Sequence, residues 1–167
     1  NGELQIYFDE LGMPYTSCGA EKSELTFDKH KCNETLRELN FRCAVSYFYK
    51  KGETINADEI TQKVGLPCFV KPNATGSSFG ISKVMKKEDL EDAIQLALQH
   101  DNKVLIEEFI DGTEVSCGIF THKEIEVFPL TEIVSHNDFF DFEAKYKGLS
   151  DEITPVRISR EETENVQ

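Results

Sequence analysis

Residues 66–84, LPCFVKPNATGSSFGISKV, restrict the possible folds and functions more than any other segment. An apolar strand at 68–71 ends in Lys71 and Pro72, and a second strand is expected at 81–84. The loop between them consists of small residues, so its backbone N–H groups and hydroxyls could approach an anion closely. A lysine beside such a loop favours a phosphate site. A flexible hairpin connection that is rich in Gly and Ser by coincidence explains the composition equally well.

The composition describes a globular protein. With 167 residues, of which 39% are hydrophobic, the chain is long enough to build the core of one ordinary domain or two small ones. No run approaches the roughly 18 apolar residues of a membrane span, and the first residues do not resemble a signal peptide. The sequence therefore favours a cytoplasmic protein that has no membrane partner.

The formal net charge of −13 argues against nucleic acid as a partner, because nucleic acids are bound by basic surfaces. An anionic ligand would need a local concentration of lysines. At about 4 Å and an effective dielectric constant of about 20, one lysine–phosphate pair is worth on the order of 4 kcal/mol before desolvation. Two or three converging lysines would therefore be sufficient.

The five cysteines and four histidines form no metal-binding pattern. No two cysteines have CxxC spacing and the histidines are scattered, so no metal ligands are predicted in this sequence. The cysteines are expected to be ordinary buried or half-buried thiols. The motifs of P-loop, Rossmann, zincin and serine-hydrolase proteins are also missing from the sequence.

The remaining segments alternate between helices and strands, which predicts an α/β fold. Helices are expected at 4–11, 28–39, 57–64 and 88–99. Strands are expected at 43–49, 68–71, 81–84, 104–109 and 114–120, with a continuing antiparallel run at 124–134. Residues 137–151 lose periodicity and are expected to form a long ordered loop. Ser159 and Glu162 form a capping box that begins a last helix.

Two further segments could carry chemistry. Residues 104–114, VLIEEFIDGTE, end a strand in two glutamates and a turn, where backbone groups could meet an adenine edge and Glu114 could bind ribose hydroxyls. A solvated strand end is the alternative. Residues 139–146, FFDFEAKY, could form a loop whose aromatic side chains anchor it while Lys145 and Tyr146 point into a site. An edge strand that packs these aromatics on the core is the alternative.

Four segments, in this order and spacing, resemble the D-alanine–D-alanine ligase family of the ATP-grasp superfamily. They are TFDK (26–29), GLPCFVKPNATGSSFGISKV (65–84), VLIEEFIDGTEVSCGI (104–119) and FFDFEAKY (139–146). The similarity extends over nearly the whole chain, because residues 2–19 resemble the last helix and strand of that family's N-terminal domain.

The resemblance implies an α/β fold that is a fragment of an ATP-grasp enzyme. Residues 1–28 would end the N-terminal α/β domain. Residues 29–110 would form the central ATP-grasp domain, an α+β unit with an antiparallel sheet. Residues 111–167 would begin the C-terminal grasp domain.

The resemblance also implies which residues contact the phosphates of ATP. Lys29 and Lys71 match the family's phosphate-binding lysines, and Ser77 lies in the matching flexible loop. Lys145 matches a lysine that reaches the terminal phosphate, and Tyr146 matches a tyrosine that latches onto Ser77 when the site closes. Ser77, Lys145 and Tyr146 are therefore the candidate catalytic residues.

The adenosine contacts follow from the same resemblance. Glu107 matches the residue that bonds the adenine amino group, and Glu108 and Ile110 occupy the positions whose backbone frames the base. Glu114 matches the ribose ligand. Together with Lys29, Lys71, Ser77 and Lys145, these residues make up the expected nucleotide site.

The implied activity is the ATP-dependent ligation of two D-alanines through an acyl phosphate, in peptidoglycan precursor synthesis. ATP and Mg²⁺ are the implied cofactors, but the family's metal ligands fall outside these residues, so this fragment alone is expected to be inactive. The implied partners are ATP and D-alanine, and the full-length protein is expected to form a homodimer. Another ATP-grasp carboxylate–amine ligase and a non-catalytic nucleotide-binding module remain the alternatives.

Overall fold

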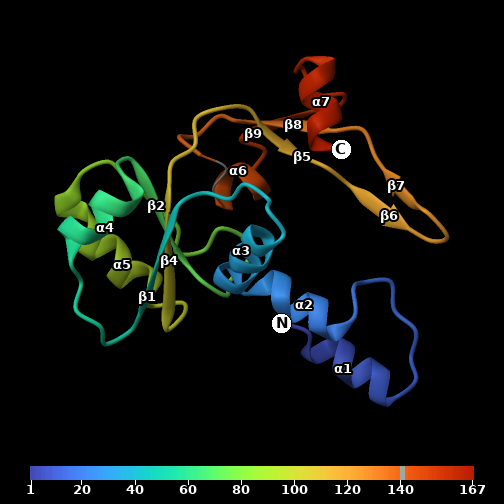
Figure 1. Ribbon diagram of the computed structural model, residues 1–167, viewed down its shortest axis with the longest axis horizontal. Helices are drawn as coiled ribbons and strands as arrows, with labels where there is room; N and C mark the ends of the chain where they lie inside the picture. Colours follow the sequence, from blue (N-terminus) through green and yellow to red (C-terminus); the bar gives the residue numbers. More distant parts are fainter. Residues whose placement is uncertain (140–141) are drawn as a thin grey trace. The chain divides into compact units, whose positions relative to one another are not determined.

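The computed structural model describes residues 1–139 and 142–167, which divide into two compact units, Asn1–Ile110 and Asp111–Gln167 (Figure 1). Each unit has its own sheet structure. Within the described ranges, no helix combines the length and the apolar character that crossing a membrane would require. The assignment of residues 1–28, 29–110 and 111–167 to three family domains stays a prediction.

The first unit contains a four-stranded sheet and five α-helices among its described elements. In chain order they are α1 (Glu3–Glu10), α2 (Ala20–Phe27), α3 (Lys29–Glu38), β1 (Ser46–Lys50), α4 (Ala57–Val64), β2 (Cys68–Pro72), β3 (Ser82–Val84), the 3₁₀ turn η1 (Lys87–Asp89), α5 (Leu90–Ala97) and β4 (Lys103–Glu108). The sheet order is β1-β4-β2-β3, and all neighbouring strands are antiparallel. The predicted antiparallel sheet is therefore confirmed.

One face of this sheet carries the main hydrophobic core. Successive strand residues point to opposite faces, and Cys68, Val70, Val104 and Ile106 are fully buried on the face that α4 and α5 cover. Helix α5 contributes its apolar stripe of Leu90, Ala93, Ile94 and Ala97. Burial raises the pKa of the Cys68 thiol to about 11, so this cysteine is a core residue rather than a reactive one.

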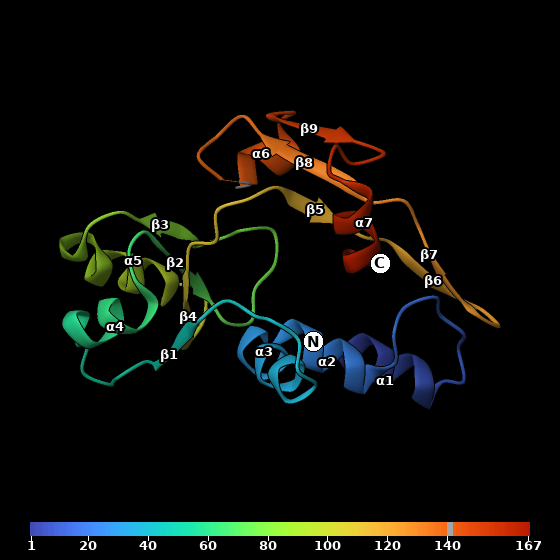
Figure 2. The ribbon, with the colours of Figure 1, turned by 45° about the horizontal axis from the view of Figure 1, so that its top comes forward.

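The opposite face of the same sheet carries charged side chains beside apolar ones such as Phe69 and the fully buried Leu105. The register pairs Phe69 with Glu107 and Lys71 with Leu105, so Lys71 and Glu107 share this face. Helix α3 lies on this side, across β4 from α4 and α5 (Figure 2). The sheet thus separates a purely structural face from a face on which ligand chemistry is possible.

Local sequence signals account for the helix limits that were predicted correctly. Helix α4 begins after Asn56, whose side chain accepts a hydrogen bond from Glu59 N–H at 3.2 Å, and it ends at Gly65 with φ +75°. Both are common helix boundary signals. Helix α7 begins at the predicted capping box of Ser159 and Glu162, which the structure confirms.

The second unit consists of short strands and two short helices among its described residues. The elements are β5 (Glu114–Ser116), β6 (Ile119–Thr121), β7 (Ile125–Val127), β8 (Thr131–Ser135), α6 (Phe142–Tyr146), β9 (Ser150–Ile153) and α7 (Arg160–Val166). Strands β5, β8 and β9 form one antiparallel sheet, and β6 and β7 form a separate two-stranded ribbon.

The prediction of one strand over 114–120 is wrong, because β5 and β6 belong to different sheets. The extended segment is interrupted at Cys117 and Gly118, between β5 and β6. Here the Gly118 carbonyl accepts a hydrogen bond from Phe128 N–H at 2.8 Å. A Cβ atom on Gly118 would lie 3.0 Å from the Phe128 ring. The absence of a side chain therefore lets the two segments approach where the sheet pairing changes.

Several other element predictions need correction. Residues 137–151 contain α6 and the start of β9 rather than one long loop, and Phe140 and Asp141 lie outside the described residues. Helix α2 was not predicted, and the helix expected at 88–99 is η1 followed by α5. Cys18 is exposed, contrary to the prediction that all five thiols are buried or half-buried.

Candidate functional site

The start of α3 is tied to the end of β2 by Asn73. Asn73 is fully buried, and its side-chain oxygen accepts a hydrogen bond from His30 N–H at 2.9 Å while its carbonyl accepts one from Lys29 N–H at 3.2 Å. These bonds satisfy N–H groups that the first helical turn leaves free. The helix that carries Lys29 is thereby fixed against the strand that carries Lys71.

The ammonium of Lys29 lies against the loop that follows β2. Its Nζ donates to the carbonyl of Thr75 at 2.8 Å and to that of Asn73 at 3.3 Å. Burial lowers the pKa of Lys29 below its ordinary value of 10.5, and the positive charge of Lys71 lowers it further. Two cationic side chains therefore stand close enough to repel each other, an arrangement that a polyphosphate would stabilise.

Lys71 is paired with Glu107 across β2 and β4. The Lys71 ammonium forms an ion pair with Glu107 Oε2, and Glu107 Oε1 accepts a hydrogen bond from Asn33 Nδ2 at 2.6 Å. Glu107 is only 9% exposed, so both oxygens of a buried carboxylate have partners. The structure thus brings Lys29, Lys71 and Glu107 together on one face of the sheet.

The loop at 73–80 contains residues in the left-handed backbone region. Ser77 and Ser78 have φ of +54° and +58°, which is uncommon for residues with a side chain and is concentrated at ligand-binding and switch segments. At Gly80, with φ +69°, a Cβ atom would lie 2.5 Å from the His100 ring. The loop therefore returns to β3 through a position that favours glycine.

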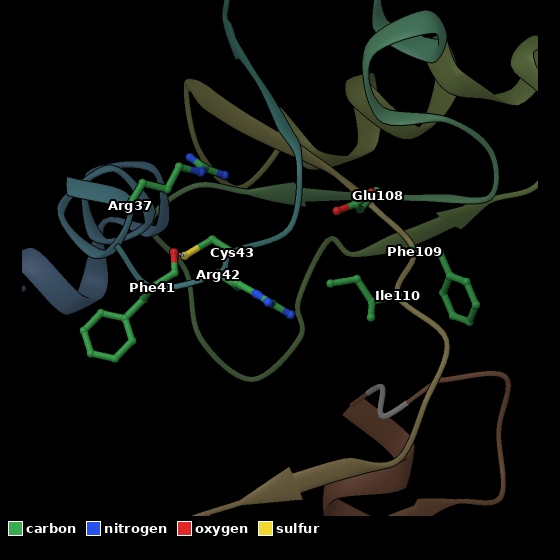
Figure 3. A pocket seen from close by; sticks show the side chains of 7 residues that line it. All are labelled: Arg37, Phe41, Arg42, Cys43, Glu108, Phe109 and Ile110. Carbon is green, nitrogen blue, oxygen red and sulfur yellow. Dashed lines mark hydrogen bonds between the residues drawn. The ribbon is translucent and has the colours of Figure 1, made fainter. Parts of the chain in front are cut away.

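A hollow of about 680 Å³ lies beside the end of β4 (Figure 3). It is lined by Arg37, Phe41, Arg42, Cys43, Glu108, Phe109 and Ile110. In Figure 3 the Arg42 guanidinium extends toward Ile110, whereas the rings of Phe41 and Phe109 point away on opposite sides. The hollow is large enough for a small-molecule ligand.

The predicted adenine-framing residues border this hollow. Glu108 donates its backbone N–H to the Val45 carbonyl at 2.9 Å, and its carboxylate accepts a bond from Val45 N–H at 2.8 Å. The N–H of Glu108 is therefore already bonded within the protein. Ile110 is 65% exposed.

Three predicted site residues, Glu114, Lys145 and Tyr146, belong to the second unit. Glu114 begins β5, opposite Ile133 of β8, and is exposed. Lys145 and Tyr146 lie in the exposed part of α6, where the Tyr146 ring is 4.8 Å from the Phe142 ring one helical turn earlier. The expectation that this segment is a loop, or alternatively an edge strand, is wrong for residues 142–146. Ser77 belongs to the first unit.

A family model described as D-ala D-ala ligase C-terminus matches residues 36–167. The chain belongs to this family. A D-alanine–D-alanine ligase of Flavobacterium johnsoniae is 54% identical over 167 residues, which are 99% of this chain and 52% of that relative. The chain spans about half the length of the curated relatives it matches.

Solved structures of D-Ala ligases share the fold. The VanG D-Ala:D-Ser ligase of Enterococcus faecalis has a TM-score of 0.83 at 33% identity, covering 99% of this chain and 49% of that one. The D-alanine–D-alanine ligase of Bacillus anthracis has a TM-score of 0.80 at 30% identity. The match covers 99% of this chain and 52% of that one. The predicted family and the ATP-grasp fold class are confirmed.

The Mg²⁺ that the D-Ala ligase family implies does not fit the described residues. Residues 1–139 and 142–167 contain no group of three or more His, Cys, Asp or Glu side chains that could hold a metal ion. Hard divalent cations need several oxygen ligands. The described side chains therefore offer no such set of oxygen ligands.

Three residues of the candidate site have no counterpart among the residues predicted from the sequence. Asn33 and Asn73 hold Glu107 and the start of α3, and Arg42 adds a cation to the hollow. One signal was available for Asn33, because it follows Lys29 by four residues and therefore shares its helix face. Nothing in the sequence pattern indicates the roles of Asn73 and Arg42, which depend on how the strands and α3 pack.

Proposed function

We propose that the intact protein is an ATP-dependent ligase that joins two D-alanines. The carboxylate of the first D-alanine attacks the γ-phosphorus of ATP, so a C–O–P linkage forms and the bond to ADP breaks. The amine of the second D-alanine then attacks the acyl carbon, and inorganic phosphate leaves as the peptide bond forms. The product would serve peptidoglycan precursor synthesis in the cytoplasm.

The observation that carries this proposal is the cluster of Lys29, Lys71 and Glu107 on one face of the sheet. Two half-buried lysine side chains suit the phosphates, because charge-assisted hydrogen bonds to phosphate oxygens are strong. A carboxylate at the strand end suits the amino group of adenine. In this proposal the backbone groups of Glu108 and Ile110 frame the base.

The proposal assigns the remaining roles on the basis of the family. Glu114 binds the ribose, Ser77 and Lys145 bind phosphate oxygens, and Tyr146 latches onto Ser77 in the closed enzyme. Lysines stabilise the charge that develops in phosphoryl transfer. Mg²⁺ is assigned to residues outside this sequence, and the intact enzyme is proposed to be a homodimer.

A second candidate activity is the joining of D-alanine to D-serine. It is favoured by the similarity to the Enterococcus faecalis D-Ala:D-Ser ligase, which matches 99% of this chain. The two activities share the nucleotide site and differ in the amine that is accepted. The assay must therefore compare both amines.

The test measures ADP release by the intact protein, expressed from its whole gene, with ATP and D-alanine alone or together with D-serine. Release with D-alanine alone supports the first activity. Release that requires D-serine replaces it with the second. If neither amino acid causes ADP release although ATP binds, the ligase proposal is overturned.

Lys71 provides the matching test of the nucleotide site. We expect Lys71→Ala to raise the ATP dissociation constant by about 10- to 100-fold, because a charge-assisted hydrogen bond is lost. Since this change also leaves buried Glu107 without its ion-pair partner, Lys71→Gln, which keeps a donor, is measured in parallel. Exposed Lys51→Ala is the control, and an unchanged dissociation constant in both Lys71 variants contradicts the assignment.

A further inference from the structure

The carboxylate of Glu107 is held by two donors from two different elements. Lys71 comes from β2 and pairs with Oε2, and Asn33 comes from α3 and donates to Oε1 at 2.6 Å. The side chain is 11% exposed. A carboxylate has about four acceptor positions, so each oxygen keeps one for a further donor.

The position of Asn33 is itself fixed by the fold. Asn33 follows Lys29 by one helical turn, so both side chains lie on the face of α3 that is turned to the sheet. The first turn of this helix is bound to Asn73 at the end of β2, and Arg37 in its last turn donates to Ser46 Oγ of β1 at 3.0 Å. The Asn33 amide therefore meets Glu107 from a helix that is anchored at both ends.

A bound nucleotide would affect the Lys71 and Asn33 contacts of Glu107 differently. Under the proposed function, a phosphate attracts the Lys71 ammonium and competes with Oε2 for it. The neutral amide of Asn33 has no such competitor. When ATP is bound, Asn33 is then the donor that keeps the Glu107 carboxylate in place.

We infer that Asn33 is a positioning residue that selects adenine over guanine by fixing the Glu107 carboxylate at the base site. Adenine presents an amino donor at its 6-position and guanine presents a carbonyl acceptor. A fixed carboxylate accepts from the first and repels the second, whereas a mobile carboxylate turns away from a carbonyl. This inference rests on the proposed ATP site.

The inference predicts a change in nucleotide selectivity rather than a general loss of binding. In the intact protein, we expect Asn33→Ala and Asn33→Asp to weaken ATP binding by about tenfold, the size of one hydrogen bond to a charged group, while GTP binding changes by less than about twofold. Asn33→Gln keeps an amide donor and is expected to recover most of the preference for ATP. Dissociation constants for ATP and GTP are measured by calorimetry at the same pH and salt concentration.

Two controls separate positioning from a structural role. Glu38→Ala changes an exposed residue of the same helix and should leave the affinity for ATP relative to that for GTP unchanged. Asn33→Ala in a Glu107→Gln background should have little further effect on ATP binding, because residues that act through one contact are not additive. The melting temperature of each variant is recorded alongside.

The measured nucleotide preference either supports or overturns the role of Asn33. The inference is supported if Asn33→Ala and Asn33→Asp both lose preference for ATP, measured as the affinity for ATP relative to that for GTP, and if Asn33→Gln recovers it. Equal weakening of ATP and GTP binding, or an unchanged ratio, overturns it while leaving the nucleotide site intact. Failure of the wild-type protein to bind ATP overturns the proposed function first, and the inference with it.

Discussion

Lys29 shows how a half-buried position changes the acid–base behaviour of a lysine. Its ammonium is held by the carbonyls of Asn73 and Thr75, and burial and the charge of Lys71 lower its pKa, which Glu107, Asp101 and Asp28 only partly offset. The lowered pKa means that Lys29 loses its proton at a lower pH than an exposed lysine does.

We therefore predict that ATP affinity of the intact protein falls with rising pH below the ordinary lysine pKa of 10.5. Under the proposed function, phosphate binds the charged form of Lys29, so ATP affinity is full below the lowered pKa of Lys29 and is lost as the pH rises through that pKa. Lys29→Arg should retain affinity to higher pH, because a guanidinium keeps its charge. ATP titrations from neutral to alkaline pH measure this, and identical profiles for wild type and Lys29→Arg would show that Lys29 is not the group responsible.

At the scale of single elements, the loop between β2 and β3 combines an open segment with one tight anchor. A Cβ atom on Gly76 would meet no atom of the described residues within 4 Å outside its immediate neighbours in the chain. A Cβ atom on Gly80 would lie 2.5 Å from the His100 ring and 3.0 Å from Pro72, and Gly80 also has φ +69°. The two glycines of one loop should therefore respond very differently to the same change.

We predict that Gly80→Ala destabilises the protein by about 1–3 kcal/mol, because the left-handed backbone and the crowding against His100 both disfavour a side chain. Gly76→Ala is the matched control and should change the free energy of unfolding by less than about 0.5 kcal/mol. Urea denaturation of both variants gives the comparison. Equal effects at the two positions would mean that the anchor at Gly80 does not constrain the loop.

The contrast between predicted and observed elements has physical causes. The limits of α4 and the start of α7 were predictable because capping groups and Gly65 mark them locally. The break between β5 and β6 was not, because Val115, Cys117 and Ile119 continue an apparent alternation through Gly118 while the partner strand changes. The five-residue helix α6 is too short to show a helical period.

The site likewise combines features that local sequence signals indicate with features that depend on long-range pairing. The sequence indicates that Lys71 and Glu107 each lie near a strand end, but their pairing depends on the antiparallel register of β2 and β4. Register is a long-range property that periodicity does not fix. Asn73 illustrates the extreme case, because its hydrogen bonds to α3 join residues more than forty positions apart.

Across the whole molecule, the two units are stabilised in different ways. The first has an apolar core between its sheet and two helices. The second contains a buried carboxylate, Glu132, which receives two side-chain hydrogen bonds from Arg157 at 2.9 and 2.8 Å. These bonds lower the pKa of Glu132 below its ordinary value of 4.5.

We predict that this pair makes the second unit sensitive to acid. Because the folded pKa of Glu132 is lowered, its contribution to stability is full above the ordinary pKa of 4.5 and is lost as the pH falls through the folded pKa. Glu132→Gln should be less stable than wild type at pH near 7, with the difference shrinking toward pH of about 3. Urea midpoints across this range measure it, exposed Glu126→Gln is the control, and a pH-independent difference contradicts the prediction.

The alternation of side chains along β2 and β4 has a consequence for how this protein can change. Val70 and Ile106 point into the apolar layer, while their neighbours Lys71 and Glu107 point to the opposite side. Inserting a single amino acid in either strand would exchange these sets, driving charges into the interior and exposing aliphatic groups where a ligand would bind. An insertion in either strand would therefore disturb the core and the candidate site at the same time. A change of length in the connecting segment at 74–79 would not exchange the two faces of the strands.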